Sequence, residues 1–382
     1  MNKQKVLIIS FAHFIHDIFS SLLAPMLPLL IEKMGITLTQ ASLMEIVRRS
    51  VSIINPLIGL MIERKDVKYF VILTPSITAI SMGLLSITSS YAIGLFLLFI
   101  AGLSAALFHI PAPAMIKELS AGKEIGKGMS YFMVGGESAR TIGPLLGAAA
   151  FSTWGLEGIW KLTPIGILAS LFLYIKLKDY KPSFKAKKIE KSEIKTIIKK
   201  VTPFFKSIAI FMSLNYTSRF GVSLFFPLFL THNGFSVEKA SIAFGIMQGA
   251  GILGALFSGK ISDKIGTDKM LTISSIGSGI MLILFLLFYK QALWIIILPL
   301  GFFLFAQSPI LLAIVNKLKS QTPTFINSIY MALNFIISSI IVYFIGFISE
   351  KIGLFNTFLI TAILTLLSIF TIPYLKKAPQ LL

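Results

Sequence analysis

Two histidines and an aspartate stand inside an apolar run near the start of the chain, which reads FAHFIHDIFSSLLAPMLPLL from Phe11. His13 and Asp17 are four residues apart, so a helix would place them on one face, whereas His16 would project about 100° away from Asp17. A carboxylate held in apolar surroundings beside an imidazole can bind and release a proton. We therefore expect Asp17 to be a protonation site that His13 tunes. The alternative is a permanently paired, structural carboxylate near a helix end.

Other ionisable residues also lie in apolar segments, where a charge is costly and normally faces a partner or a polar cavity. Glu45 can pair with Arg48 or Arg49, and Glu137 with Arg140, at spacings of three or four residues on a helix. Either these clusters neutralise themselves, or the two acids are further proton-coupling candidates and Arg48 and Arg140 contact a substrate. Arginines outnumber acids in the apolar segments, which leaves a cation for an anionic partner.

A second group of polar residues is a candidate substrate-binding set. Arg219 has no acid in its own apolar segment; it contacts an anionic substrate group, pairs with an acid of the first half, or extends to a lipid headgroup. His109 precedes Pro111, whose ring frees backbone carbonyls and kinks a helix, so this histidine is either a ligand or a partner of those carbonyls. Tyr216 and Gln248 are polar positions that could line the same cavity.

Several kinds of chemistry find no support in the chain. It has no cysteine, which excludes disulfides, thiolate metal sites and cysteine nucleophiles. The histidines and acids show no spacing typical of a metal site or of a nucleophilic catalyst, and no P-loop is present. We therefore expect no enzyme activity, no metal, no cofactor and no direct use of ATP.

The elements that carry these residues are predicted by hydropathy. Of 382 residues, 55% are hydrophobic and 13% are charged, and the mean hydropathy is +0.85, well above that of a soluble domain. A membrane-spanning helix needs roughly 20 mostly apolar residues. The sequence predicts an all-α membrane protein with twelve such helices: 6–32, 39–62, 69–88, 91–116, 126–152, 158–177, 203–230, 237–259, 270–289, 292–316, 325–349 and 353–375.

The formal charge of +19 follows the predicted topology. Lys and Arg gather in the loops on the side of the N-terminus, which is the pattern of cytoplasmic loops in inner-membrane proteins. We therefore expect a multi-pass protein of the inner (plasma) membrane with both termini in the cytoplasm. The first helix lacks a cleavage site and is expected to be retained. The positive charge is explained by topology, and no nucleic-acid partner is expected.

The chain divides into two similar halves. PLLIEKMGITLTQAS from Pro28 resembles PLFLTHNGFSVEKAS from Pro227, at an offset that pairs Gly35 with Gly234. We predict an N-terminal six-helix bundle at 1–177, a basic cytoplasmic linker at 178–202 and a C-terminal six-helix bundle at 203–382. Part of the linker is either an amphipathic helix on the inner leaflet or a solvated loop. Such repeats build transporters whose site lies between the halves and opens alternately to each side.

Two loop motifs and a helix motif carry a resemblance to a known family. GKISDKIGTDK follows the eighth predicted helix, and GLMIERKDVK occupies the corresponding place after the second. Both resemble the cytoplasmic loop motif of the major facilitator superfamily, in which an acid and a base form a breakable gate. The matching residues are Gly59, Glu63 and Arg64 in the first half and Gly259, Asp263 and Lys264 in the second. The fifth predicted helix contains a GPxxG sequence, Gly143, Pro144 and Gly147, similar to the helix-packing motif of antiporters in that superfamily.

A narrower resemblance is carried by AHFIHDIFSSLLAPMLPLL, FHIPAP and VGGESARTIGPLL, which together look like the fosmidomycin-resistance branch of the superfamily. This resemblance implies a proton-coupled multidrug exporter of drug-like or amphipathic small molecules, working as a monomer by alternating access. The sequence differs from this branch after His109: Ile110, Pro111 and Ala112 follow, and the acid that is usual there is missing. An uptake symporter for an organic anion, and an uncoupled lipid-translocating or sensor protein, are the alternatives.

Overall fold

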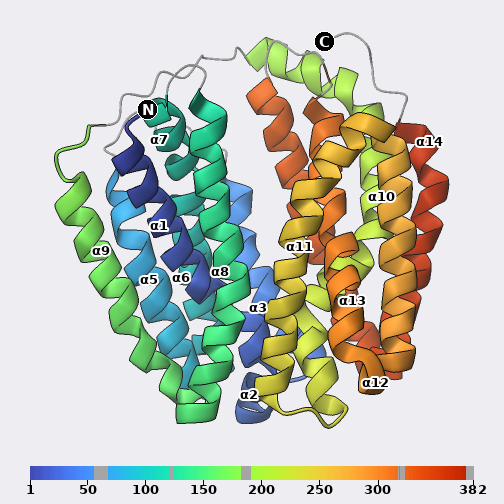
Figure 1. The fold of residues 1–382 in the computed structure, drawn as a ribbon, viewed down its shortest axis with the longest axis horizontal. Coiled ribbons are helices and arrows are strands. Elements are labelled where there is room, and N and C mark those ends of the chain that lie inside the picture. The colour runs from blue at the N-terminus through green and yellow to red at the C-terminus, as the bar shows by residue number, and fades with distance from the viewer. Residues whose placement is uncertain (56–67, 121–123, 182–190, 317, 319–322, 376–382) are drawn as a thin grey trace. The chain divides into compact units, whose positions relative to one another are not determined.

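The computed structural model describes the chain except for residues 56–67, 121–123, 182–190, 317, 319–322 and 376–382 (Figure 1). The described part is helical, with short turns between helices and no β-strand. It forms two compact units, Met1–Ala186 with Leu230–Gly245, and Lys187–Phe229 with Ile246–Leu382. The predicted domain boundaries come from the count of apolar segments, and they stay a prediction.

The first unit contains the helices of the first six predicted spans. They are α1 (Lys3–Ser20), α2 (Leu23–Met34), α3 (Leu38–Ser50), a 3-10 turn (Val51–Ile54), α5 (Lys68–Ile87), α6 (Tyr91–His109), α7 (Pro111–Ser120), α8 (Ile125–Trp154), a second 3-10 turn (Glu157–Leu162) and α9 (Thr163–Leu177). The predicted span 39–62 is described only in its first part, because residues 56–67 lie outside the description. Helix α1 packs mainly against α8 and also against α5 and α9. Figure 1 shows these helices side by side.

The rest of the chain forms longer helices. They are α10 (Lys191–His232), α11 (Val237–Ile265), α12 (Thr267–Asn316), α13 (Pro323–Leu367), a 3-10 turn (Ser368–Thr371) and α14 (Ile372–Leu375). They belong to the second unit except for the end of α10 and the start of α11, within Leu230–Gly245. Helices α12 and α13 each hold two predicted spans, divided by non-helical backbone at Ala292 and at Gly353. Helix α10 begins inside the predicted linker, so residues 191–202 are helical and continuous with the seventh span.

The helices have the length and surface of membrane-spanning segments. Seven described stretches are apolar and long enough to cross a bilayer, and two of them, Thr267–Val315 and Ile329–Leu375, have 49 and 47 residues, enough for two crossings each. The described helices together are long enough for the twelve predicted spans. Large apolar side chains point outward, for example Phe96 at 62% and Ile295 at 74% exposure, as expected where lipid replaces water.

The internal repeat is visible in the backbone. Gly35 and Gly234 follow the first predicted span of each half, after α2 and α10, with positive φ angles of 62° and 88°, a conformation that glycine adopts without a Cβ clash. Two residues later, Thr37 and Ser236 each accept a hydrogen bond at 3.2 Å from the backbone N–H three residues further on. The same turn chemistry therefore starts the second helix of both halves.

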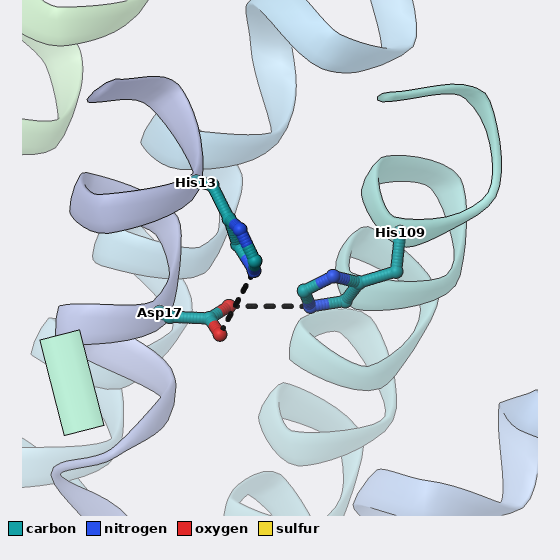
Figure 2. Close-up of side chains that lie close together, drawn as sticks. All are labelled: His13, Asp17 and His109. Atoms are coloured by element: carbon teal, nitrogen blue, oxygen red, sulfur yellow. Dashed lines mark ion pairs between the residues drawn. The ribbon is translucent and has the colours of Figure 1, made fainter. Parts of the chain in front are cut away.

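The fourth span is broken where the sequence carries its prolines. Helix α6 ends at His109, and α7 begins at Pro111 after the intervening Ile110. The pyrrolidine ring of proline cannot donate the hydrogen bond that would continue α6, so the helix ends just before it. This break places His109 at a helix end, facing α1 (Figure 2).

Candidate functional site

The carboxylate of Asp17 lies among three histidine rings inside the first unit. Figure 2 shows two of them, His13 and His109. Helix α1 supplies His13, whose Nε2 is 3.3 Å from Asp17 Oδ2, and His16, whose Nδ1 is 3.0 Å from Asp17 Oδ1. The end of α6 supplies His109, whose Nε2 is 3.2 Å from Asp17 Oδ1. The side chains of Asp17 and His13 are only 7% exposed, whereas that of His109 is 39% exposed.

Two of these contacts differ from the expectation. The sequence predicts the contact between His13 and Asp17 from their spacing, but it sends His16 away from the carboxylate. In the structure His16 turns back and contacts Asp17. The 100° between neighbouring residues describes their Cα–Cβ directions, while their Cα atoms are about 3.8 Å apart, within reach of a long ring. His109 is the residue whose proximity no local spacing could have indicated.

Aromatic rings close one side of the cluster. The ring of His13 stacks on Phe132 at 4.0 Å between centroids, and the ring of His16 stacks on Phe108 at 4.8 Å. Both phenylalanines belong to a buried apolar core at this level of the unit. Because these apolar contacts exclude water on this side, an unpaired charge on Asp17 or on a histidine would be costly there. The carboxylate and the imidazole rings therefore stabilise one another.

The hydrogen bonds of His13 constrain where a proton lies. Its Nδ1 is 2.8 Å from the carbonyl oxygen of Phe132, and because a carbonyl can only accept, Nδ1–H is the donor. Its Nε2 faces Asp17 Oδ2 at 3.3 Å without the geometry of a hydrogen bond. If that nitrogen and the carboxylate were both unprotonated, two lone pairs would meet. One additional proton, on His13 or on Asp17, relieves the repulsion.

Glycines on α8 make room for the cluster. A Cβ added to Gly136 would lie 2.3 Å from Cε1 and 2.4 Å from Nε2 of His13. About two turns further on, a Cβ at Gly143 would meet the Oγ of Ser21 and the carbonyl oxygen of Ile18, and a Cβ at Gly147 would lie 3.1 Å from Leu22. The small residues of the VGGES and GPxxG stretches thus let α8 approach α1 closely. Pro144 is accommodated within α8.

The described arginines of the first unit lie against acids of their own helices. Arg48 binds Glu45 through Nε and Nη2, both at 2.8 Å, and Arg49 contacts the same carboxylate. Arg140 Nη1 is 2.8 Å from Glu137 Oε1. Glu45 is buried, while the side chains of Glu137 and Arg140 are 24% and 43% exposed. The expected internal pairing is present in both clusters, and the Glu45 cluster retains one more cation than anion.

Arg219 lies in an aromatic and hydroxyl-rich part of the second unit. Its guanidinium carbon is 4.8 Å from the ring centroid of Phe305 and 5.7 Å from that of Tyr216. Its Nη1 donates to Ser308 Oγ. The hydroxyl of Tyr216 is 3.3 Å from Ser308 Oγ and 3.4 Å from the hydroxyl of Tyr330. The sequence singled out Arg219 and Tyr216 but missed Ser308 as the residue that joins them, because a serine in an apolar helix carries no distinctive signal.

The remaining predicted residues are partly described. The Oε1 of Gln248 is buried and has no hydrogen-bond partner among the described residues. Asp263 and Lys264 are exposed at the end of α11, and no described atom lies within 4 Å of a Cβ built on Gly259. No other helix in the described part of the chain therefore approaches Gly259 closely. Gly59, Glu63 and Arg64 lie outside the described residues.

The twelve-helix fold, with polar groups buried within its helices, defines a multi-pass membrane transporter. The chain matches the Major Facilitator Superfamily over residues 9–340 and belongs to that family. Members of this family are transporters, and the chain is not an enzyme.

Relatives and solved structures agree with this assignment. The chain is 22% identical to the fosmidomycin resistance protein of Escherichia coli, over 95% of this chain and 91% of that protein. It is 23% identical to the multidrug resistance protein MdtG of Escherichia coli, over 74% and 71% of the two chains. Its fold resembles that of a bacterial homolog of the human lysosomal transporter Spinster in an inward-facing conformation, with a TM-score of 0.78, 14% identity and coverage of 99% and 97%.

Proposed function

We propose that this protein is a proton-coupled exporter of drug-like or amphipathic small organic molecules that works by alternating access. Relatives named for fosmidomycin resistance and multidrug resistance support the substrate class. We place it in the inner membrane as a monomer with cytoplasmic termini, an orientation supported by the distribution of Lys and Arg. The two bundles, 1–177 and 203–382, joined by the linker 178–202, would move relative to each other during alternating access.

The observation that carries the proton coupling is the arrangement around Asp17. A buried carboxylate within 3.3 Å of three imidazole nitrogens can share a proton with a neighbouring ring. The Nδ1–H of His13 is fixed by the Phe132 carbonyl, so the extra proton belongs between His13 Nε2 and Asp17 Oδ2. Gaining and losing that proton changes the charge inside the bundle, which is what couples a proton to a conformational change. Glu45 and Glu137 are secondary candidates, because arginines already neutralise them.

The other predicted roles follow from placement. Arg48, His109, Arg140, Arg219, Tyr216 and Gln248 are the proposed substrate contacts. His109 suits this role because its partly exposed ring connects the Asp17 cluster with its surroundings. Asp263 and Lys264 are exposed at a helix end, where an acid and a base can form and break ion pairs as a cytoplasmic gate.

A second candidate function is uptake of an organic anion together with a proton. The arrangement around Arg219 favours it, because aromatic rings and hydroxyls orient a guanidinium suited to a carboxylate or phosphonate group. An uncoupled lipid-translocating or sensor protein is the third candidate, and it predicts no substrate-dependent proton movement.

The test is internal pH in proteoliposomes that contain the purified protein, during addition of fosmidomycin, amphipathic drugs or organic anions. The proposal expects substrate-dependent proton flux that is abolished by Asp17→Asn and retained by Asp179→Asn, a matched change at an exposed aspartate outside the spans. Flux unchanged by Asp17→Asn would remove Asp17 from the proton path. No flux with any compound would favour the uncoupled candidate.

The sign of an imposed pH gradient separates export from uptake. An antiporter accumulates substrate in vesicles that are acidic inside, because protons leave as substrate enters. A symporter accumulates substrate when the outside is acidic. This thermodynamic distinction does not depend on the orientation in which the protein inserts into the vesicles.

A further inference from the structure

The cluster around Asp17 also has the composition and spacing of a metal site. One ligand atom each from His13, Asp17 and His109 lies within 4.8 Å of the other two. Two imidazoles and one carboxylate are a ligand set used by divalent first-row transition metals, whereas Mg²⁺ and Ca²⁺ prefer oxygen ligands alone. We propose that His13 Nε2, His109 Nε2 and the Asp17 carboxylate bind one exchangeable divalent transition metal ion of the Zn²⁺ class.

The distances fit such an ion with little rearrangement. Metal–nitrogen and metal–oxygen bonds of about 2.0–2.2 Å in a tetrahedral site place neighbouring ligand atoms about 3.3–3.6 Å apart. The observed separations are 3.3 Å between His13 Nε2 and Asp17 Oδ2 and 3.2 Å between His109 Nε2 and Asp17 Oδ1, so each histidine faces a different oxygen of the carboxylate. Closing the remaining separation, which is within 4.8 Å, requires movement of the half-exposed His109.

The surroundings orient the ligands as metal sites do. A metal-binding histidine usually donates its other ring N–H to a backbone carbonyl or a carboxylate, which aims the free lone pair at the metal. His13 does this: Nδ1 donates to Phe132 O at 2.8 Å, and Nε2 is buried with no hydrogen bond. His16 Nδ1 holds Asp17 Oδ1 at 3.0 Å and so fixes the carboxylate. Gly136 leaves the space that the His13 ring occupies.

The uneven exposure of the ligands makes the bound ion exchangeable. His13 and Asp17 are 7% exposed, but His109 is 39% exposed, so one side of the site is open. Three protein ligands leave a fourth position for water or for a group on an organic molecule. The site therefore suits an ion that enters alone or as part of a small chelate, in contrast to a closed structural site with four protein ligands.

This inference does not rest on proton-coupled export, because metal binding is measured without transport. Tag-free protein is purified in detergent, stripped with a chelator, and titrated with Co²⁺ while its visible absorption is recorded. Zn²⁺ is then added to displace the Co²⁺. The expected result is one Co²⁺ per chain with the absorption of a site of low coordination number, lost on addition of Zn²⁺.

Matched variants identify the ligands. His13→Gln, Asp17→Asn and His109→Ala are each expected to weaken Co²⁺ affinity by about tenfold or more. His232→Ala is the control, because His232 is exposed at the end of α10 and outside the cluster. His109→Ala is the decisive variant, since a half-exposed ring can be removed with little effect on folding, which the thermal unfolding midpoint checks.

A further titration compares two sources of the metal, the free Zn²⁺ ion and Zn²⁺ held by a small chelator. The inference is supported if either form binds more tightly to the wild type than to His109→Ala. Binding of less than one Co²⁺ per chain, or affinity unchanged in His109→Ala, overturns it. Neither outcome touches the proton assay with Asp17→Asn, so failure of the metal site and failure of the proposed function are distinguishable.

Discussion

Gly136→Ala tests the cluster around Asp17 without removing any of its ionisable side chains. The new methyl group would lie 2.3 Å from Cε1 and 2.4 Å from Nε2 of His13, where carbon atoms in contact normally keep about 3.5 Å. The ring must therefore move by about 1 Å or change its rotamer. Stacking on Phe132 at 4.0 Å limits the directions in which it can move.

The movement also weakens the interaction that sets the orientation of His13. Phe132 and Gly136 lie one turn apart on α8, so a ring displaced from Gly136 also moves away from the Phe132 carbonyl. A shift of about 1 Å lengthens the 2.8 Å hydrogen bond beyond useful range. Overpacking with loss of one hydrogen bond costs roughly 1–3 kcal/mol. For a unit of this size we expect the unfolding midpoint to fall by about 2–12 °C.

The assay combines thermal unfolding in detergent with proton flux in proteoliposomes. Gly126→Ala is the matched control, because it changes the same residue type on the same helix and no described atom lies within 4 Å of its new Cβ. We expect Gly126→Ala to behave as the wild type, and Gly136→Ala to remain folded with a lower midpoint and to lose proton flux. Equal stability and equal flux in the two variants would refute the claim that Gly136 positions His13.

Three further predictions concern other parts of the chain. Arg219→Lys is expected to reduce transport of anionic substrates by about tenfold or more, because lysine lacks the planar, bidentate donor; full retention would remove Arg219 from the substrate site. Glu45→Gln is expected to lower the unfolding midpoint more than Glu137→Gln, since Glu45 is buried between two arginines and Glu137 is partly exposed; the reverse order would contradict the pairing seen in the structure. Because the chain has no cysteine, Ser89→Cys and Gly126→Cys report topology without background in labelling of whole cells: the first should react with an impermeant maleimide and the second only after lysis, and the opposite pattern would invert the predicted orientation.

Much of the fold could be predicted because a bilayer imposes length and polarity on each helix. Runs of apolar residues indicated the helices to within a few residues in the described chain: the predicted 69–88 is Lys68–Ile87, and 126–152 lies within Ile125–Trp154. The turns at Gly35 and Gly234 were visible as a repeat because glycine, a hydroxyl residue and an apolar run recur in the same order. Hydropathy does not show whether a polar segment continues the helix of the next apolar span. It therefore did not indicate that α10 begins at Lys191, inside the predicted linker, and continues into the seventh span.

In the candidate site, contacts three or four residues apart on one helix could be predicted from the sequence, but contacts between helices could not. His13 and Asp17 could be paired from sequence because a helix repeats every 3.6 residues, and Glu45 could be paired with its arginines for the same reason. His109 on α6 contacts Asp17 on a different helix, α1. That contact depends on where α6 ends and on how closely α8 lets α1 approach. Local spacing carries no such information. The expectation of no metal site rests on spacing within single helices, whereas the proposed third ligand, His109, comes near His13 and Asp17 only after the helices have packed.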